Sequence, residues 1–141
     1  MKHILILLLL LAGILVIMPM NACKKSVQNL KEDYVLGVMT QGRWYLENYT
    51  EYGIDKTSDF QAYEFQFYKD YRLDAISSSG VTTGTWAGDV NSITLTVNLG
   101  STSDVLKRLN HVWKFIRSNI GLAFAETTTP NGLISIRLKR K

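Results

Sequence analysis

The chain has 141 residues, 20% of them charged, and a formal net charge of +4 at neutral pH. This length is enough for one domain of ordinary size and too small for two. The charge excess is mild and comes largely from Lys24, Lys25 and the last five residues, 137–141. A nucleic-acid binder normally gathers its cations on one face and interleaves them with aromatic residues. We therefore expect no nucleic-acid partner.

The first 22 residues have the organisation of a secretory signal. Lys2 supplies a basic start, residues 4–20 form an uncharged apolar run, and small or polar residues follow up to Ala22. This order of a basic region, an apolar core and a small residue at a cleavage point is typical of an exported protein. We expect residues 1–22 to be removed, which would leave 119 residues.

The residue after the expected cleavage point, Cys23, is the only cysteine of the chain. A signal that ends in small residues directly before a lone cysteine resembles the lipobox of bacterial lipoproteins. That resemblance implies acylation of Cys23 with palmitate-type chains and a membrane partner through this anchor. Lys24 and Lys25 follow where surface-exported Bacteroidetes lipoproteins carry acidic residues, so we expect the outer membrane and its periplasmic side.

An uncleaved membrane anchor is the alternative for this segment. A spanning helix needs about 20 apolar residues, and the run falls slightly short of that length. Pro19 and Asn21 interrupt the run where such a helix would have to continue, whereas Lys24 and Lys25 would fit a stop signal. Lipidation is the preferred interpretation because Cys23 has no disulfide partner.

Residues 23–40 are predicted to hold the lipidated cysteine, a short tether and a short helix over residues 30–39. From residue 41 onwards the apolar residues recur every second position, which indicates strands with one apolar face. Strands are expected at residues 43–50, 63–68, 71–77, 81–87, 93–99, 111–118, 120–126 and 133–140. Between them, residues 101–104 supply helix N-caps, which predict a short helix near 102–109.

About eight short antiparallel strands in sequence must hide their edges, because unpaired edges promote aggregation. An up-and-down meander that closes into a barrel does this, and eight strands leave an interior that side chains fill or that holds one small ligand. The sequence therefore predicts an all-β barrel domain over residues 41–141. A β-sandwich is the alternative, with residues 100–110 as its crossing connection.

Several short motifs support this interpretation by resemblance. Gly42-Arg43-Trp44 resembles the Gly-x-Trp signature of lipocalins, and Thr83-Gly84-Thr85-Trp86 resembles a strand of the lipocalin-like domains of small Bacteroidetes envelope lipoproteins. The segment 55–67, the short helix and Trp113 follow the order of that family. The resemblance spans residues 41–140 and implies a barrel that binds, with no catalytic residues to carry over.

The aromatic and aliphatic residues of the strands define the expected interior. Trp44 is expected to plug the base of the barrel, which is a structural role. If a ligand cavity exists, its expected lining consists of Tyr63, Phe65, Phe67, Leu95, Val97, Trp113, Phe115 and Phe124. Trp86 is also expected to be buried, and the crowding of large aromatic residues favours a small or closed cavity.

The sequence offers no constellation for catalysis or metal binding. His111 is the only histidine after the leader, and a catalytic histidine needs an oriented partner and a nucleophile in reach. One histidine and an acylated cysteine cannot form a four-ligand zinc site. The pairs Glu47 with Glu64 and Asp70 with Asp74 are explained more simply as outward strand residues. We expect neither enzyme activity, nor a metal site, nor a cofactor.

Two functions remain open. The preferred one is an envelope lipoprotein whose barrel binds a small apolar ligand, such as a lipid fragment or a pigment. The alternative is a solid barrel that docks an envelope protein or a glycan through its outer face, with Tyr49, Tyr52 and Tyr68 as expected exposed contacts. A cavity of about 300 Å³ or more would favour the container, and a filled interior would favour the docking module.

Overall fold

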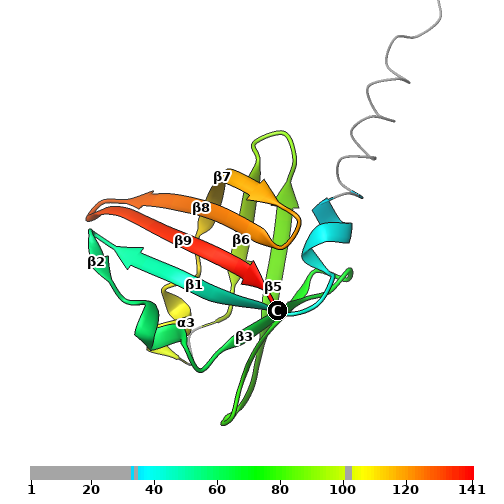
Figure 1. Ribbon diagram of the computed structural model, residues 1–141, viewed down its shortest axis with the longest axis horizontal. Coiled ribbons are helices and arrows are strands. Elements are labelled where there is room, and N and C mark those ends of the chain that lie inside the picture. Colours follow the sequence, from blue (N-terminus) through cyan, green and yellow to red (C-terminus); the bar gives the residue numbers. More distant parts are fainter. Residues whose placement is uncertain (1–32, 34, 101–102) are drawn as a thin grey trace, which may run out of the picture. The chain divides into compact units, whose positions relative to one another are not determined.

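The computed structural model describes residues 33, 35–100 and 103–141. The predicted leader, Cys23 and the tether lie outside the described residues. Within the described part, residues 35–39 are helical and are followed by a run of strands (Figure 1). The elements are β1 (Trp44–Glu51), β2 (Ile54–Asp55), η1 (Thr57–Phe60), β3 (Glu64–Phe67), β4 (Arg72–Ser77), β5 (Gly80–Asp89), β6 (Thr94–Asn98), α3 (Asp104–Lys107), β7 (Val112–Asn119), β8 (Leu122–Thr129) and β9 (Gly132–Arg140).

Each strand from β3 to β9 pairs antiparallel with the next, and β9 returns to pair with β1 along its whole length. Trp44 lies opposite Arg140 at one end of this pair, and Glu51 lies opposite Ile134 at the other. The result is a closed barrel of eight antiparallel strands, with β2 as an extra strand beside β1. The predicted all-β meander is confirmed, and the sandwich alternative is wrong, because one sheet closes on itself.

The seam between β1 and β3 is the weakest part of the closure. The two strands share a single residue pair, Trp44 opposite Phe65. Beyond it the loop between them satisfies the exposed edge of β1. The backbone N–H of Tyr49 donates to the Thr57 hydroxyl at 2.9 Å, and the N–H of Lys56 donates to the Tyr49 carbonyl at 2.9 Å. The connection between β1 and β3, for which no strand was predicted, therefore holds β2 and η1, which complete the wall.

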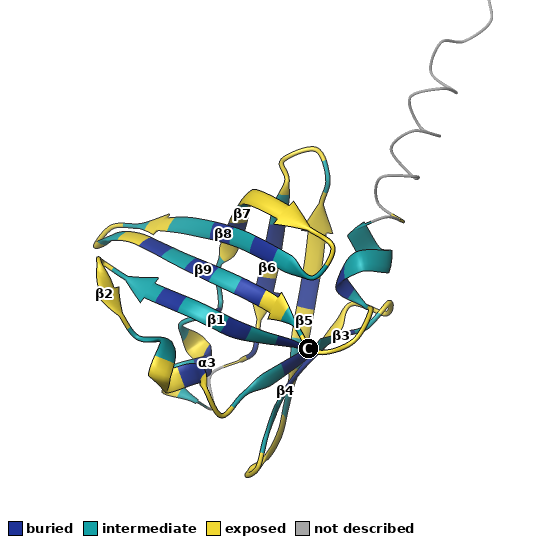
Figure 2. Cartoon of the chain, viewed as in Figure 1, coloured by how far each residue is buried: buried dark blue, intermediate teal, exposed yellow. Residues whose placement is uncertain are grey.

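Apolar side chains alternate with polar ones along the strands, so the core fills the inside of the barrel (Figure 2). The three tryptophans, Trp44, Trp86 and Trp113, are each at most 2% exposed, as predicted. Their indole N–H groups all donate to backbone carbonyls, which satisfies the one polar atom each ring carries into the core.

Two β-bulges change which side chains point inward. In β1 the register shifts between Leu46 and Asn48, so Tyr49 turns inward and is fully buried. The prediction that Tyr49 is an exposed contact is wrong for this reason. In β7 the register shifts between Phe115 and Arg117, so Arg117 lies opposite the outward-facing Phe124. A bulge adds one residue to one strand and reverses the alternation beyond it.

The last hairpin is tighter than predicted. Pairing continues to Thr129 opposite Gly132, so only Pro130 and Asn131 form the loop. Proline at the second position of the turn and glycine at the fourth suit a type I turn. Strand β8 therefore extends three residues beyond the expected end at residue 126.

Candidate functional site

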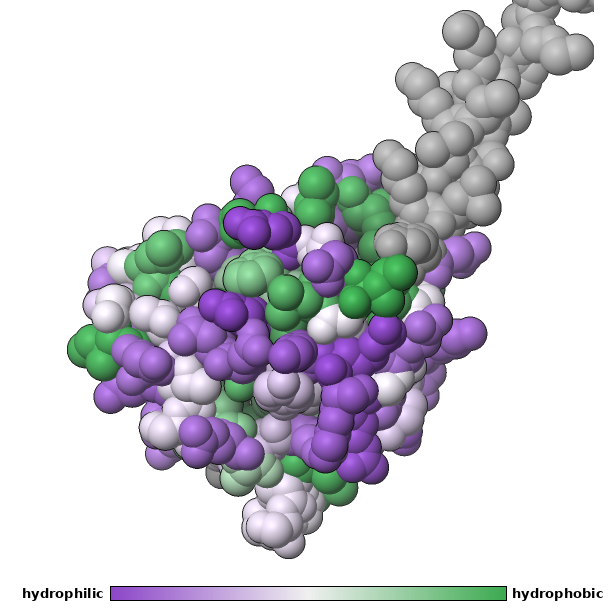
Figure 3. Space-filling view, viewed as in Figure 1, coloured by the Kyte–Doolittle hydropathy of each residue, from purple (hydrophilic) through white to green (hydrophobic). Residues whose placement is uncertain are grey.

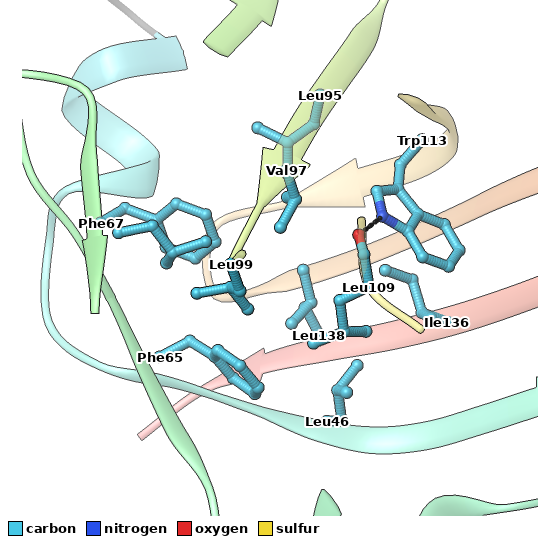
Figure 4. Close-up of a pocket in the computed structure, with 11 residues that line it drawn as sticks. Leu46, Phe65, Phe67, Leu95, Val97, Leu99, Leu109, Trp113, Ile136 and Leu138 are labelled. Carbon is cyan, nitrogen blue, oxygen red and sulfur yellow. Dashed lines mark hydrogen bonds between the residues drawn. The ribbon is translucent and has the colours of Figure 1, made fainter. Parts of the chain in front are cut away.

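The interior of the barrel is almost completely filled. The internal cavity has a volume of about 20 Å³ and is lined by eleven apolar side chains that point toward one another (Figure 4). A cavity on this measure needs about 10–15 Å³ to hold one water, and apolar cavities stay dry. A ligand pocket has a volume of about 300–1,000 Å³. The interior therefore has no room for a small-molecule ligand unless core side chains move.

Five of the eight predicted lining residues surround this internal cavity. They are Phe65, Phe67, Leu95, Val97 and Trp113. Among the lining residues absent from the prediction is Leu109, whose carbonyl accepts the Trp113 indole N–H at 2.9 Å. Leu109 follows α3 directly, so this contact holds the helical connection between β6 and β7 against the core.

The other three predicted residues lie elsewhere. Tyr63 is half-buried before β3, where its ring stacks on that of Phe65 at 6.5 Å between centroids. Phe115 lines a second pocket, near Trp44. Phe124 lies on the outer surface, because its neighbours Ala123 and Ala125 take the inward positions of β8. The prediction of Phe124 as an interior residue is therefore wrong.

Trp44 closes one end of the barrel beneath the helical residues 35–39. Its ring is 1% exposed, and its indole N–H donates to the Met39 carbonyl at 2.9 Å. A pocket of about 110 Å³ lies beside it, lined by Val35, Phe115 and Ile93 among others. This pocket is too small for a ligand of ordinary size. The burial of the Trp44 ring at the end of the barrel is consistent with the predicted role as a plug.

The opposite end is closed by an aromatic pair under an arginine. The rings of Tyr49 and Phe60 lie 4.6 Å apart, and the Arg108 guanidinium lies over both. Arg108 pairs with Asp59 at 2.7 Å and with Glu51 at 3.8 Å. Burial of the Tyr49 hydroxyl, followed by the nearby charge of Glu51, raises the pKa of Tyr49 well above its ordinary value. Tyr49 therefore stays neutral and serves the core.

A larger hollow lies outside, on the face formed by β7, β8, β9 and β1. It has a volume of about 300 Å³, and we call it the outer groove; its lining includes Asn48, Ile116, Phe124, Glu126, Ser135 and Arg137. Figure 3 views the molecule from the side of β8, β9 and β1 and shows mainly hydrophilic side chains there, with hydrophobic patches among them. Among the pockets formed by the described residues, the groove is our candidate site because it combines ligand-sized volume with polar groups.

The register of the strands lines up the groove residues in rows. One row crosses all four strands: Arg117 lies opposite Phe124, Phe124 opposite Arg137, and Arg137 opposite Asn48. The guanidinium carbons of Arg117 and Arg137 lie 5.2 and 5.0 Å from the centre of the Phe124 ring. The next row holds Lys114, Glu126 and Ser135.

Two ion pairs hold the β9 and β1 side of the outer groove. Glu47, in the β1 bulge, accepts hydrogen bonds from Lys139 at 3.2 Å and from Arg137 at 3.1 Å. The hydrogen bond from Lys139, with that from Arg137 and both positive charges, lowers the pKa of Glu47 below its ordinary value. Glu64 similarly binds Lys141 and Arg43, which lower its pKa. Each of these carboxylates has its own cations, so the two do not form a shared acid pair.

The other side chains considered for catalysis or metal binding make structural contacts. His111 packs edge-on against Trp113 with 5.6 Å between ring centroids. Asp74 accepts from the Thr83 hydroxyl at 2.8 Å and lies 3.8 Å from Arg72. Among the described residues there is no cluster of three or more His, Cys, Asp or Glu side chains that could hold a metal ion. Nor does any helix there have the length and apolar character to cross a membrane.

Arg137, which lines the outer groove, and Arg117, which lies beside the groove next to Phe124, were not predicted as site residues. Arg117 and Arg137 stand at outward strand positions, and nothing in their sequence context separates them from ordinary solvated cations. Their meeting over Phe124 depends on the β7 bulge and on the pairing register, which apolar alternation alone does not define.

A fold of this kind is found in a solved structure. The crystal structure of a DUF4847 family protein from Bacteroides vulgatus is similar, with a TM-score of 0.55 and 16% sequence identity over 76% of this chain and 97% of that one. Identity this low shows the fold alone. No protein-family model matches the chain, and no curated protein does.

Proposed function

We propose that this protein is a non-catalytic docking module of the cell envelope. In this proposal a solid barrel is held at a membrane by acylated Cys23 and binds a partner through its outer surface. The observation that carries the proposal is the filled interior, with a cavity of only about 20 Å³. The outer groove is about fifteen times larger and has the charged groups that the interior lacks.

The envelope location is supported by the sequence and by the similar fold. The leader and Cys23 resemble a lipoprotein signal, and the barrel motifs resemble lipocalin-like domains of Bacteroidetes lipoproteins. The solved protein with a similar fold comes from Bacteroides vulgatus. We place the module on the periplasmic side of the outer membrane, because Lys24 and Lys25 follow the cysteine.

The container function, binding of a small apolar ligand, is the weaker candidate. A lipid chain would have to displace side chains such as Phe65, Leu95 and Trp113, which are each at most 2% exposed. Well-packed cores resist inserted volume, at a typical cost of about 1–3 kcal/mol for even a few extra methylene groups.

Cargo analysis tests the proposal. The full chain is purified in a non-lipid-like detergent, examined by native mass spectrometry and extracted with organic solvent. We expect no stoichiometric cargo and no quenching of tryptophan fluorescence by a panel of fatty acids. Leu95→Ala provides a positive control, since it opens an apolar cavity able to take benzene. Reproducible apolar cargo in the unaltered protein would replace docking by the container function.

A further inference from the structure

The sheet face around the outer groove carries more positive charge than its acids use, with Lys114, Arg117, Arg137 and Lys139 against Glu47 and Glu126. Arg117 makes no ion pair among the described residues, although its guanidinium lies in the row beside Phe124. Arg137 pairs with Glu47 through Nη1, but its Nε is buried and has no hydrogen-bond partner. The accessible positive charge on this face is therefore that of Arg117, which has no carboxylate partner among the described residues.

The surroundings of these two arginines fit a carboxylate ligand. A guanidinium offers donors in a planar fork that matches a carboxylate, and two guanidinium groups flank one aromatic ring here. Lys114 adds a third cation in the neighbouring row, and Lys139 a fourth on β9. The carboxylates that face this group are Glu47, already paired with Arg137 and Lys139, and Glu126.

The same surroundings favour a peptide over a sugar. Sugars commonly stack on an open aromatic face, whereas two guanidinium groups lie 5.2 and 5.0 Å from the centre of the Phe124 ring and compete for that contact. Ile116 lines the groove with its side chain 56% exposed, which offers a contact for an apolar side chain of the ligand. A backbone cannot join the sheet at β8 or β9 as an added strand, because both of these strands are paired along both sides.

We propose that the outer groove binds an acidic peptide segment of a partner protein, with its carboxylates on Arg117 and Arg137 and an apolar side chain on Ile116. This inference rests on the proposed docking function and names the partner's chemistry. Association should weaken with salt, because exposed charges are screened within about 8 Å at physiological ionic strength.

Peptide binding to the full chain in detergent micelles tests this inference. The probe is a fluorescent Glu-Glu-Leu-Glu-Glu peptide, compared by anisotropy with Gln-Gln-Leu-Gln-Gln. We expect the acidic peptide to bind at least about tenfold more tightly, a difference of about 1.4 kcal/mol. Arg117→Gln should remove most of this preference, and Arg117→Lys should retain part of it, because lysine keeps the charge but loses the fork.

Arg72→Gln is the matched control. Arg72 also lies over an aromatic ring, 4.0 Å from the centre of Tyr68, but outside the groove. The Arg72→Gln substitution removes one positive charge, as Arg117→Gln does, but at a place outside the groove. It should therefore leave the preference for the acidic peptide unchanged. Thermal melts of each variant report whether the barrel is intact.

Three results with the peptides would overturn the inference. They are equal binding of the two peptides, an Arg117→Gln variant that binds as well as the unaltered chain, and an equal loss in Arg72→Gln. Binding of an acidic polysaccharide such as polygalacturonate without binding of the peptide would also overturn it, in favour of a glycan partner. None of these results depends on the cargo analysis, which tests the docking function separately.

Discussion

At the residue scale, Trp44 has two structural roles. Its ring fills one end of the barrel, and its indole N–H holds the helical residues before β1. The hydrogen bond to the Met39 carbonyl, 2.9 Å long, ties residues 35–39 to the barrel. The Arg140 guanidinium lies 6.0 Å from the ring and brings the end of β9 to the same place. One side chain therefore joins both ends of the described domain.

Trp44→Ala should destabilise the fold by about 3–5 kcal/mol, the usual range for removing a large buried aromatic side chain. Urea unfolding followed by circular dichroism measures the change. Tyr45→Ala, at the neighbouring outward position of β1, is the comparison and should cost much less. A loss below half the expected value for Trp44→Ala would mean that Trp44 is not a core plug.

The ion pairs of Glu47 predict how stability depends on pH. Because the folded protein lowers the pKa of Glu47, mainly through the Lys139 hydrogen bond, this contribution is present above the unfolded pKa of about 4.3. It is lost as the pH falls through the lower folded pKa. Near neutral pH, Glu47→Gln should therefore be less stable than the unaltered protein, and the difference should shrink in acid.

Thermal melts between neutral pH and strong acid measure this convergence. Glu126→Gln is the control, because Glu126 makes no ion pair among the described residues. Stability curves of Glu47→Gln and the unaltered protein that stay parallel throughout would contradict the prediction.

At the scale of the elements, the crossing of β5 and β6 requires a glycine. A Cβ on Gly84 would lie 2.8 Å from the Leu99 Cα and would collide with the Asn98 carbonyl oxygen. These are backbone atoms, so the neighbour cannot rotate away. The motif Thr83-Gly84-Thr85-Trp86 therefore has a physical reason within this fold, which is the close approach of two strands at a barrel corner.

Gly84→Ala should destabilise the barrel by about 1–3 kcal/mol or more through overpacking. Gly88→Ala in the same strand is the matched control, since its Cβ would meet Val35 at an ordinary 3.5 Å. We expect Gly88→Ala to be neutral or slightly stabilising. Chemical denaturation measures both variants, and equal effects at the two positions would refute the close-approach explanation.

At the scale of the whole molecule, closure of the sheet removes the free edges, and the filled core leaves the outer surface for function. Membrane attachment would then set where that surface acts. Each buried CH₂ of an acyl chain contributes about 0.8 kcal/mol, so several chains on Cys23 would make the attachment effectively permanent.

Cys23→Ser should abolish labelling by radioactive palmitate and move the protein out of the detergent phase, or leave it unprocessed. The measurement is detergent-phase partition of labelled cells. The groove variant Arg117→Gln is the control and should be labelled normally. Continued membrane labelling of Cys23→Ser would contradict the lipoprotein proposal.

The strands, their order and most of the core were predictable from the sequence, because alternation with period two is a local property that each strand carries by itself. Trp44, Phe65 and Trp113 are inside as expected for this reason. Closure through β9 and β1 also followed, since a meander of this length has few other ways to hide its edges.

Only the tertiary structure decided where the alternation shifts and which strands meet. The bulges at Glu47 and Ile116 leave no distinctive local signal, yet they turn Tyr49 inward and bring Arg117 opposite the outward-facing Phe124. Aromatic crowding in the sequence favours a small or closed cavity, but the cavity volume depends on how side chains from opposite walls interdigitate, so only the structure decided that the interior is filled. The sequence by itself therefore determined the barrel, whereas its packing and register decided that the candidate site lies on the outside.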